Sequence, residues 1–172
     1  MVFGTNGVSR KGAAVSAASH YLTYSRLATR GVLNLGAEIF TVTGESWMDH
    51  EYSSSQLGDG QIGWDWVSVQ LNDGREIMVY RMRRQDGTID PFSTLAWVDR
   101  AGEVRHWPAS AMGWEVLTRW TSPRTQAAYP SRIRLTAPDA ASVGGASYIL
   151  EPVSVDQELV GGLGGIPYWE GA

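Results

Sequence analysis

Short apolar runs, broken by turn signals, recur along the whole chain. Glycine is frequent, at 20 of 172 residues, and the words NDG, QDG and DRAG stand at 72–74, 85–87 and 99–102. Between such turns lie runs rich in Val, Ile, Met, Trp and Tyr, with the spacing of an antiparallel meander. The predicted strands cover 32–43, 46–52, 63–71, 75–84, 92–99, 103–107, 114–120, 131–136 and 146–153. This pattern predicts an all-β fold, either a barrel or a sandwich.

Helical periodicity is weak throughout, and one segment is ambiguous. The stretch GAAVSAASHYLTYSRLA at 12–28 fits a short helix, and its part SHYLTYSRLAT at 19–29 fits a strand equally well. No low-complexity segment and no internal repeat interrupts the pattern. Both alternatives therefore stay open for this segment alone.

One hairpin can be predicted residue by residue. The sequence GWDWVSVQL-NDG-REIMVYRMRR at 63–84 has a three-residue loop that ends in Gly74, as in a type I turn followed by a left-handed glycine. Counting outward from this loop places Asp65 opposite Arg81. Residues directly opposite each other share one face of the sheet. The other face then carries an aromatic cluster of Trp64, Trp66, Tyr80 and Met82.

Composition narrows the class of protein. The net charge is −4 without a basic stripe, which argues against a nucleic-acid surface. No apolar stretch reaches eighteen residues, so no membrane span is expected. Without cysteine the chain has no disulfide, no thiolate nucleophile and no Cys-based zinc site. The N-terminus lacks the apolar core of a signal peptide, which leaves the compartment open: cytoplasmic, or exported if an upstream region is missing.

The aromatic content is unusual. Eight Trp and seven Tyr stand against three Phe. Trp and Tyr combine a large apolar face with one polar group, which suits a wall that holds an organic ligand. A Trp-rich core is the alternative.

The motif WMDHE at 47–51 contains three neighbouring side chains that can take part in acid–base chemistry. In a strand, Asp49 and Glu51 share one face with Trp47, while His50 points to the other face. Consecutive residues of a strand cannot converge on one metal ion, so we expect no metal site and no cofactor. Two readings remain: the carboxylates pair with arginines and backbone amides, or one of Asp49, His50 and Glu51 is a general acid.

Two other features of the sequence bear on possible binding sites. Arg81 and Arg83 share a face and either clamp an anionic group of a ligand or form a solvated salt-bridge ladder. The GGLGG run at 161–165 lacks the strand–helix context of a phosphate loop, and we read it as a flexible loop.

Several uncommon sequence motifs follow one another along the chain: ASHYLTYSRLATRG, GESWMDHEYSS, GWDWVSVQLNDGREIMVYRMRRQDG, WTSPRTQAAYPSRIRL and DQELVGGLGGIPYWEGA. In this order they resemble the AttH-like proteins and hydroxyneurosporene synthases, which are carotenoid 1,2-hydratases. The resemblance implies lipocalin-like β-barrel halves, a crossover segment with the first strands at 1–45, and a barrel domain at 46–172. It also implies an upstream half and further strands beyond YWEGA. A barrel left open there predicts self-association, or a second chain or domain that completes the sheet.

The resemblance also bears on chemistry. The hydratases carry His where this chain has Asp65, and Arg81 opposite Asp65 favours a charged carboxylate that has no proton to give. Glu158 and Glu170 match words of the family. The family includes hydratases of long polyenes, and related lipocalin-like proteins include cyclases, some of the Diels–Alder type.

The sequence therefore predicts that an apolar polyene- or polyketide-like molecule binds in a Trp/Tyr-lined pocket. Cofactor-free cyclisation, hydration or protonation is the chemistry that such a site would perform, by holding one reactive conformer beside a few polar groups. A non-catalytic carrier and a structural half-barrel are the alternatives. The candidate catalytic residues are Asp49, His50, Glu51 and Asp65. The candidate ligand-binding residues are Trp47, Trp64, Trp66, Tyr80, Met82, Arg81, Arg83 and Trp120.

Overall fold

The computed structural model describes residues 3–53, 57–139, 142–161 and 165–172. Within these ranges all the long elements are β-strands, and every strand pair is antiparallel. The chain divides into two compact units, Met1–Ala109 and Ser110–Ala172. The predicted all-β, antiparallel fold is thus confirmed.

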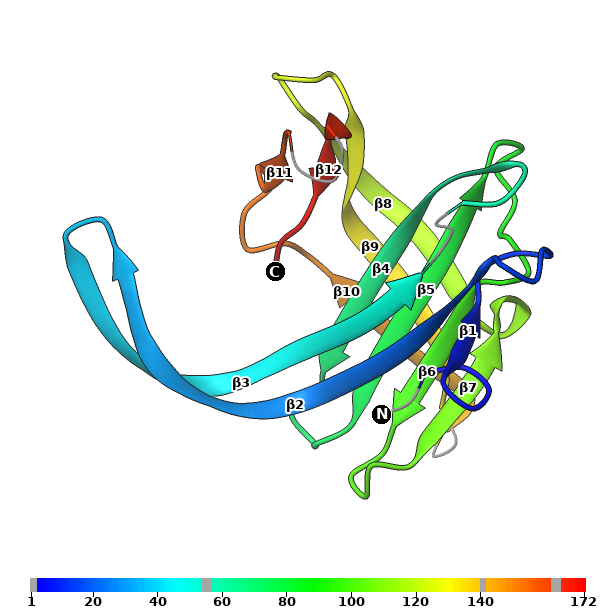
Figure 1. Cartoon of the computed structure of the whole chain (residues 1–172), viewed down its shortest axis with the longest axis horizontal. Coiled ribbons are helices and arrows are strands. Elements are labelled where there is room, and N and C mark those ends of the chain that lie inside the picture. The colour runs from blue at the N-terminus through cyan, green and yellow to red at the C-terminus, as the bar shows by residue number, and fades with distance from the viewer. Residues whose placement is uncertain (1–2, 54–56, 140–141, 162–164) are drawn as a thin grey trace. The chain divides into compact units, whose positions relative to one another are not determined.

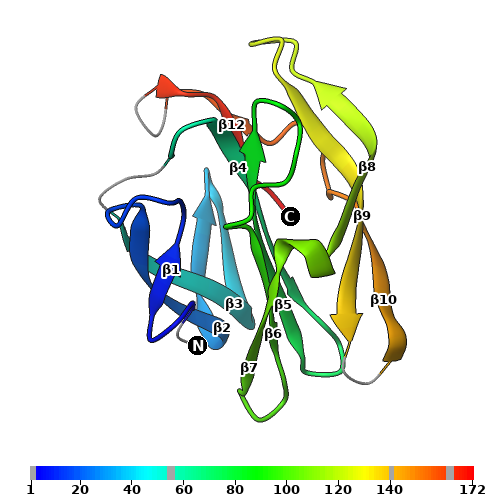
Figure 2. The same ribbon diagram turned by 90° about the vertical axis from the view of Figure 1, so that its right-hand side faces the viewer.

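The first unit holds two sheets whose strands follow chain order (Figure 1). One sheet consists of β1 (Val8–Arg10), β2 (Ala18–Leu35) and β3 (Glu38–Ser53). The other consists of β4 (Gln61–Gln70), β5 (Glu76–Arg84), β6 (Thr94–Val98) and β7 (Val104–Pro108). Figure 2 shows β4 to β7 running side by side as a meander.

A 3₁₀ turn, η1 (Ala109–Ala111), precedes the strands of the second unit. Its main sheet has the order β10–β9–β8 and contains β8 (Gly113–Thr121), β9 (Ala128–Asp139) and β10 (Ser142–Leu150). A two-stranded ladder joins β11 (Glu158–Leu159) to β12 (Tyr168–Trp169). Most of the GGLGG run, residues 162–164, lies outside the described residues.

One predicted strand is wrong, and β1, β11 and β12 have no counterpart among the predicted strands. The segment 32–43 is not a single strand, because β2 ends at Leu35 and β3 begins at Glu38. Gly36 supplies the turn between them with a φ of 62°, a conformation that glycine adopts without steric cost. The ambiguous segment 19–29 is strand and not helix, since β2 runs through it. The expected domain limit at 45/46 falls inside β3.

The β4–β5 hairpin has the predicted register. Asp65 lies opposite Arg81 and Trp66 opposite Tyr80. Its loop closes with hydrogen bonds from the Leu71 amide to the Arg75 carbonyl (2.8 Å) and from the Gly74 amide to the Leu71 carbonyl (3.1 Å). Gly74 has a φ of 84°, as the three-residue loop requires.

The core of the first unit lies between its two sheets. Phe3, Tyr21, Met78 and Ala96 form a buried cluster, against which Trp47 and Val104 pack. Tyr21 comes from β2, and Met78 and Ala96 are paired neighbours on β5 and β6. This cluster holds the inward face of β2 and β3 against the β4–β7 sheet, and it thereby fixes the candidate site described below.

Beyond their shared core, β2 and β3 continue as a two-stranded ribbon of residues 27–45, called the arm here (Figure 1). A β-bulge between Tyr24 and Leu27 marks its root. There Arg26 forms ion pairs with Glu45 and with the buried Glu76. The side-chain amide of Gln70 donates to the Ser25 carbonyl at 2.7 Å.

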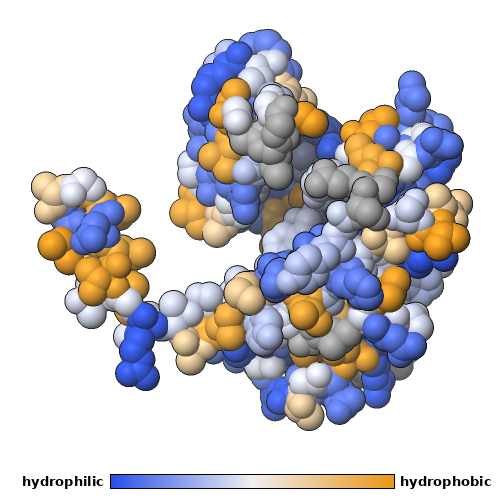
Figure 3. Space-filling model, in the orientation of Figure 1, coloured by the Kyte–Doolittle hydropathy of each residue, from blue (hydrophilic) through white to orange (hydrophobic). Residues whose placement is uncertain are grey.

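Large apolar side chains of the arm lie exposed, and Figure 3 shows hydrophobic surface on its projecting end. They are Val32, Leu33, Leu35, Ile39 and Phe40, with exposed fractions of 42–73%. A two-stranded ribbon by itself buries little apolar surface. The arm therefore depends on the contacts at its root for its position within this unit.

Candidate functional site

The strand β3 divides the WMDHE side chains as predicted. Trp47, Asp49 and Glu51 face the β4–β7 sheet, where they contact residues of β2, β4 and the segment after β1. His50 lies on the opposite, exposed face, with its ring 4.5 Å from that of Tyr52. Asp49 and Glu51 therefore share one face, and His50 does not join them.

Asp49 accepts three hydrogen bonds from side chains. Its Oδ2 accepts from the Tyr21 hydroxyl at 2.9 Å. Its Oδ1 accepts from the Thr23 hydroxyl at 2.8 Å and from the Trp47 indole N–H at 2.9 Å. Because Thr23 lies opposite Asp49 in the β2–β3 ladder, strand pairing places these groups together. Three donors aimed at one carboxylate hold it in a fixed orientation.

Tyr21 connects this carboxylate to the aromatic cluster of β4. Its hydroxyl donates to Asp49 and accepts from the Trp66 indole N–H at 3.1 Å. Burial and the neighbouring Asp49 charge raise the pKa of Tyr21 far above its usual value, so the phenol stays protonated as a donor. The Trp47 and Trp66 rings meet edge-on at 6.2 Å. Asp49, Tyr21, Trp47 and Trp66 thus form one network across the two sheets.

Glu51 has different partners. The Lys11 ammonium lies 2.8 Å from its Oε1, and the Ser19 hydroxyl donates to the same oxygen at 2.5 Å. The Lys11 side chain is only 4% exposed, whereas that of Glu51 is 33% exposed. Burial lowers the pKa of Lys11 against the opposing pull of Glu51 and Asp49. The pair thus has a buried cationic end and a carboxylate that reaches the surface.

The predicted pocket aromatics differ in exposure. Trp64 and Trp66 are 38% and 37% exposed, which leaves part of each ring available to a ligand. Tyr80 is buried beneath Lys11, whose ammonium lies 3.5 Å from the ring centroid, and burial raises the pKa of its phenol. Met82 is fully buried.

The Asp65 side chain forms an ion pair on the other face of the β4–β5 ladder. Its Oδ2 accepts from Arg81 Nη1 at 2.6 Å, and its Oδ1 lies 3.8 Å from Arg83 Nε. Strand alternation separates this pair from Trp66 and Tyr80. Of the predicted catalytic residues, Asp49 and Glu51 therefore lie beside the aromatic network, and Asp65 does not.

The remaining candidates belong to the second unit. Trp120 stacks on Tyr129, its partner in the β8–β9 ladder, with centroids 6.2 Å apart. Glu158 is buried and accepts hydrogen bonds from Ser122, Thr125 and Tyr129 at 2.5–2.9 Å. These bonds tie β11 to the β8–β9 turn, which is a structural role. Glu170 is exposed, and its amide donates to the Gln157 carbonyl.

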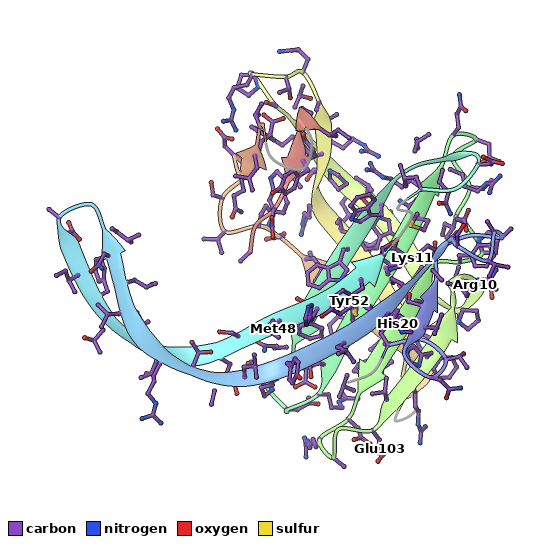
Figure 4. The ribbon with its side chains drawn as sticks, in the orientation of Figure 1. Arg10, Lys11, His20, Met48, Tyr52 and Glu103 are labelled. Atoms are coloured by element: carbon purple, nitrogen blue, oxygen red, sulfur yellow. The ribbon has the colours of Figure 1, made fainter. Side chains whose placement is uncertain are left out.

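The outer face of β2 and β3 is partly apolar. Met48 and Tyr52 lie along β3, with His20 on the neighbouring strand (Figure 4). Met48 and Tyr52 are 44% and 59% exposed. A hollow of about 480 Å³ at one end of this face is lined by Val8, Val15, Ser16, Ala18, Ser19, His20, Tyr52 and Ser53.

Two kinds of feature are absent from the described residues. Among those residues, no three His, Asp or Glu side chains are grouped as ligands for a metal ion. None of the helices within the described ranges has the length and apolarity to span a membrane.

Sequence reasoning missed four residues of this site. Ser19, Tyr21 and Thr23 lie on a segment whose strand character was ambiguous, so their pairing with β3 was not predicted. Lys11 lies in a loop, 40 positions before its partner Glu51. One signal was available in the sequence: Lys11 is the only lysine in the chain, beside thirteen arginines.

The comparisons with known proteins show an AttH-like chain. A sequence profile described as AttH-like matches residues 1–172. A crystal structure assigned as AttH from Nitrosomonas europaea is 34% identical, with a TM-score of 0.86 over 99% of this chain and 52% of that chain. The crystal structure of kievitone hydratase from Nectria haematococca is 16% identical, with a TM-score of 0.71 over 94% and 47% of the two chains. The chain thus spans about half the length of each solved relative. No curated protein matches the sequence.

Proposed function

Because this chain belongs to the AttH-like family, a lipocalin-like family, we propose that it binds a largely apolar, polyene- or polyketide-like molecule along β4. The observation that carries the proposal is the partial exposure of Trp64 and Trp66 on β4, together with the hydrogen bond that joins Trp66 to the polar network through Tyr21. Exposed indole rings lose water when an apolar chain covers them, which is worth about 25 cal/mol per Å². The polar network behind them fixes the orientation of Trp66 and lowers the entropy lost on binding.

We propose further that the site protonates a carbon–carbon double bond and directs water to the cation that forms. Glu51 is the group suited to this step, since its side chain is one-third exposed and its Oε2 is used by neither Lys11 nor Ser19. The faces of Trp64 and Trp66 stabilise a cation through their π-electrons. The added water then returns its proton to Glu51, so the reaction consumes only alkene and water. The name of kievitone hydratase, a structural relative of this fold, agrees with this class of reaction.

A carrier without turnover is the second candidate function. The three donors around Asp49 support it, because a carboxylate held by three hydrogen bonds is built for rigidity more than for proton exchange. In a carrier, Asp49 only holds the Trp47 indole and, through Tyr21, the Trp66 indole in place. Shape-guided cyclisation differs from both candidates in its product, since it changes the carbon skeleton and adds no water.

Ligand binding is tested with a fluorescent conjugated polyene acid as the probe, titrated into the protein. Trp66→Ala should weaken its binding by about 1–3 kcal/mol, or roughly 5- to 150-fold in Kd. Trp97→Phe is the matched control, because Trp97 is buried on the opposite face of the β4–β7 sheet. Equal affinity of Trp66→Ala and the parent protein would refute the site.

Turnover is tested by following the loss of polyene absorbance and by mass analysis of the product. Hydration adds the mass of one water, cyclisation leaves the mass unchanged, and a carrier yields no product. Glu51→Gln should keep the binding of the probe and abolish hydration. If the Glu51→Gln variant still hydrates the probe, Glu51 is not the acid of the proposed mechanism.

We also propose that the arm pairs with a second copy of this chain. Both edges of the ribbon from 27 to 45 offer backbone hydrogen-bonding groups, and its large apolar side chains are exposed. A twofold axis lets one edge serve as its own partner, as in isologous dimers. Light scattering at rising concentration should show a dimer that Phe40→Asp returns to the monomer. A parent protein that stays monomeric throughout would exclude self-pairing.

A further inference from the structure

Lys11 is the one lysine of a chain that otherwise uses arginine for its basic side chains. The two residues differ in chemistry, because a guanidinium stays protonated in proteins whereas a lysine ammonium can release its proton when buried. A surface charge or a simple salt bridge does not require this property. The position of the single lysine is therefore informative.

The backbone holds Lys11 in place from both sides. Its amide donates to the Ala17 carbonyl at 2.8 Å, and its carbonyl accepts from the Gln61 side-chain amide at 2.7 Å. The neighbouring Arg10 binds the carbonyls of Gly12 and Ala13, which closes the loop after β1. Lys11 and Arg10 follow one another at the end of this strand (Figure 4).

The side chain of Lys11 points into the space between the sheets. Its ammonium lies 3.5 Å from the centroid of the Tyr80 ring and 5.0 Å from that of Tyr21. Its charged partner is Glu51, 2.8 Å away. With 4% of the side chain exposed, the ammonium cannot touch a ligand on β4, and Lys11 can act only through Glu51.

We propose that Lys11 and Glu51 form one proton-holding pair, in which Lys11 supplies the proton that Glu51 passes to the ligand. Lys11 is thus a positioning residue for the hydration proposed above, on which this inference rests. The ammonium gives its proton to Glu51 Oε1, and Glu51 gives a proton to the alkene. When water has added to the cation, its surplus proton returns through Glu51 to the neutral amine. The balance is one alkene and one water to one alcohol.

The surroundings of the pair fit this role. The side chains around the pair are Asp49 from β3, Tyr21 from β2 and Tyr80 from β5, and of these only Asp49 is a carboxylate. Asp90, which raises the pKa of Tyr80, is paired with Arg84. Burial lowers the pKa of Lys11, which brings its proton affinity closer to that of a carboxylate. The phenols of Tyr21 and Tyr80 have raised pKa values, so they do not compete as proton donors.

The test uses the single lysine directly. Protein grown with ¹³C-labelled lysine gives one side-chain signal, whose pH dependence reports the protonation of Lys11 alone. In the parent protein we expect the midpoint below that of free lysine, and in Glu51→Gln lower again by about one pH unit or more. A Lys11 midpoint that Glu51→Gln leaves unchanged would show that the pair does not share a proton.

Lys11→Arg separates proton supply from charge. It keeps a cation beside Glu51 in place of the lysine ammonium. Hydration of the polyene probe should nevertheless stay about 10- to 100-fold slower than in the parent protein, because arginine does not release its proton. Full activity in Lys11→Arg would overturn the inference and leave Glu51 as the acid. Loss of probe binding in Trp66→Ala, together with a Lys11 midpoint that Glu51→Gln does not change, would overturn the inference and keep the binding site.

Discussion

Asp49 allows the sharpest test of the network, because its removal leaves buried donors without acceptors. Asp49→Ala deletes hydrogen bonds from Tyr21, Thr23 and Trp47, and the first two residues are only 3% and 1% exposed. An unpaired buried donor costs about 1–3 kcal/mol. Asp49 itself is partly exposed, so water relieves some of this penalty. We therefore expect a loss of about 3–4 kcal/mol in the free energy of unfolding, out of roughly 5–15 kcal/mol for a domain.

Two further variants show how much each hydrogen bond contributes to this loss of unfolding free energy. Asp49→Asn keeps one oxygen that can accept the hydrogen bond from Thr23. It should lower the free energy of unfolding by about 1–2 kcal/mol. Combined with Tyr21→Phe, which removes the donor to Oδ2, it should cost about 1–2 kcal/mol less than the sum of the two single changes.

Urea unfolding followed by circular dichroism gives these free energies by linear extrapolation. His50→Ala is the control, since His50 is the next residue but faces solvent, and it should change stability by at most about 0.5 kcal/mol. A loss in Asp49→Ala no larger than that in His50→Ala would refute the network as a source of stability.

Three other outcomes follow from single residues. Arg26→Met leaves the buried Glu76 without its cation, and we expect faster trypsin cleavage in the arm, seen by mass analysis of the fragments. Gly74→Ala forces a φ of 84° on alanine and should cost about 1–2 kcal/mol in thermal or urea unfolding. Gly31→Ala is its control, because neither a positive φ nor a close neighbour constrains that glycine. Burial lowers the pKa of His106, so the unfolded chain binds more protons and stability falls as the pH drops below about 6.5. In His106→Gln this part of the decline between pH 7.5 and 5.5 should vanish, and a parent protein with flat stability over that range would contradict the assignment.

The sequence predicted what depends on local pattern. The β4–β5 register followed from one three-residue loop with Gly74 last, and the placement of Asp49 and Glu51 followed from strand alternation. The turn at Gly36 was missed because it interrupts a run of apolar and small residues without a second turn signal. Lys11 was missed for a different reason, since its role depends on contacts between segments 40 positions apart.

The order of the strands has a consequence for the rate of folding. In all three larger sheets the hydrogen-bonded neighbours are also neighbours along the chain. Strand pairing of this kind closes only short loops, and proteins rich in such local contacts fold faster than sandwiches with distant pairings. Contacts such as those between Lys11 and Glu51 and between Tyr21 and Trp66 are less local, since they join segments 40 and 45 positions apart. The hairpins should consequently form first, and the polar network should assemble late, as the two sheets of the first unit dock.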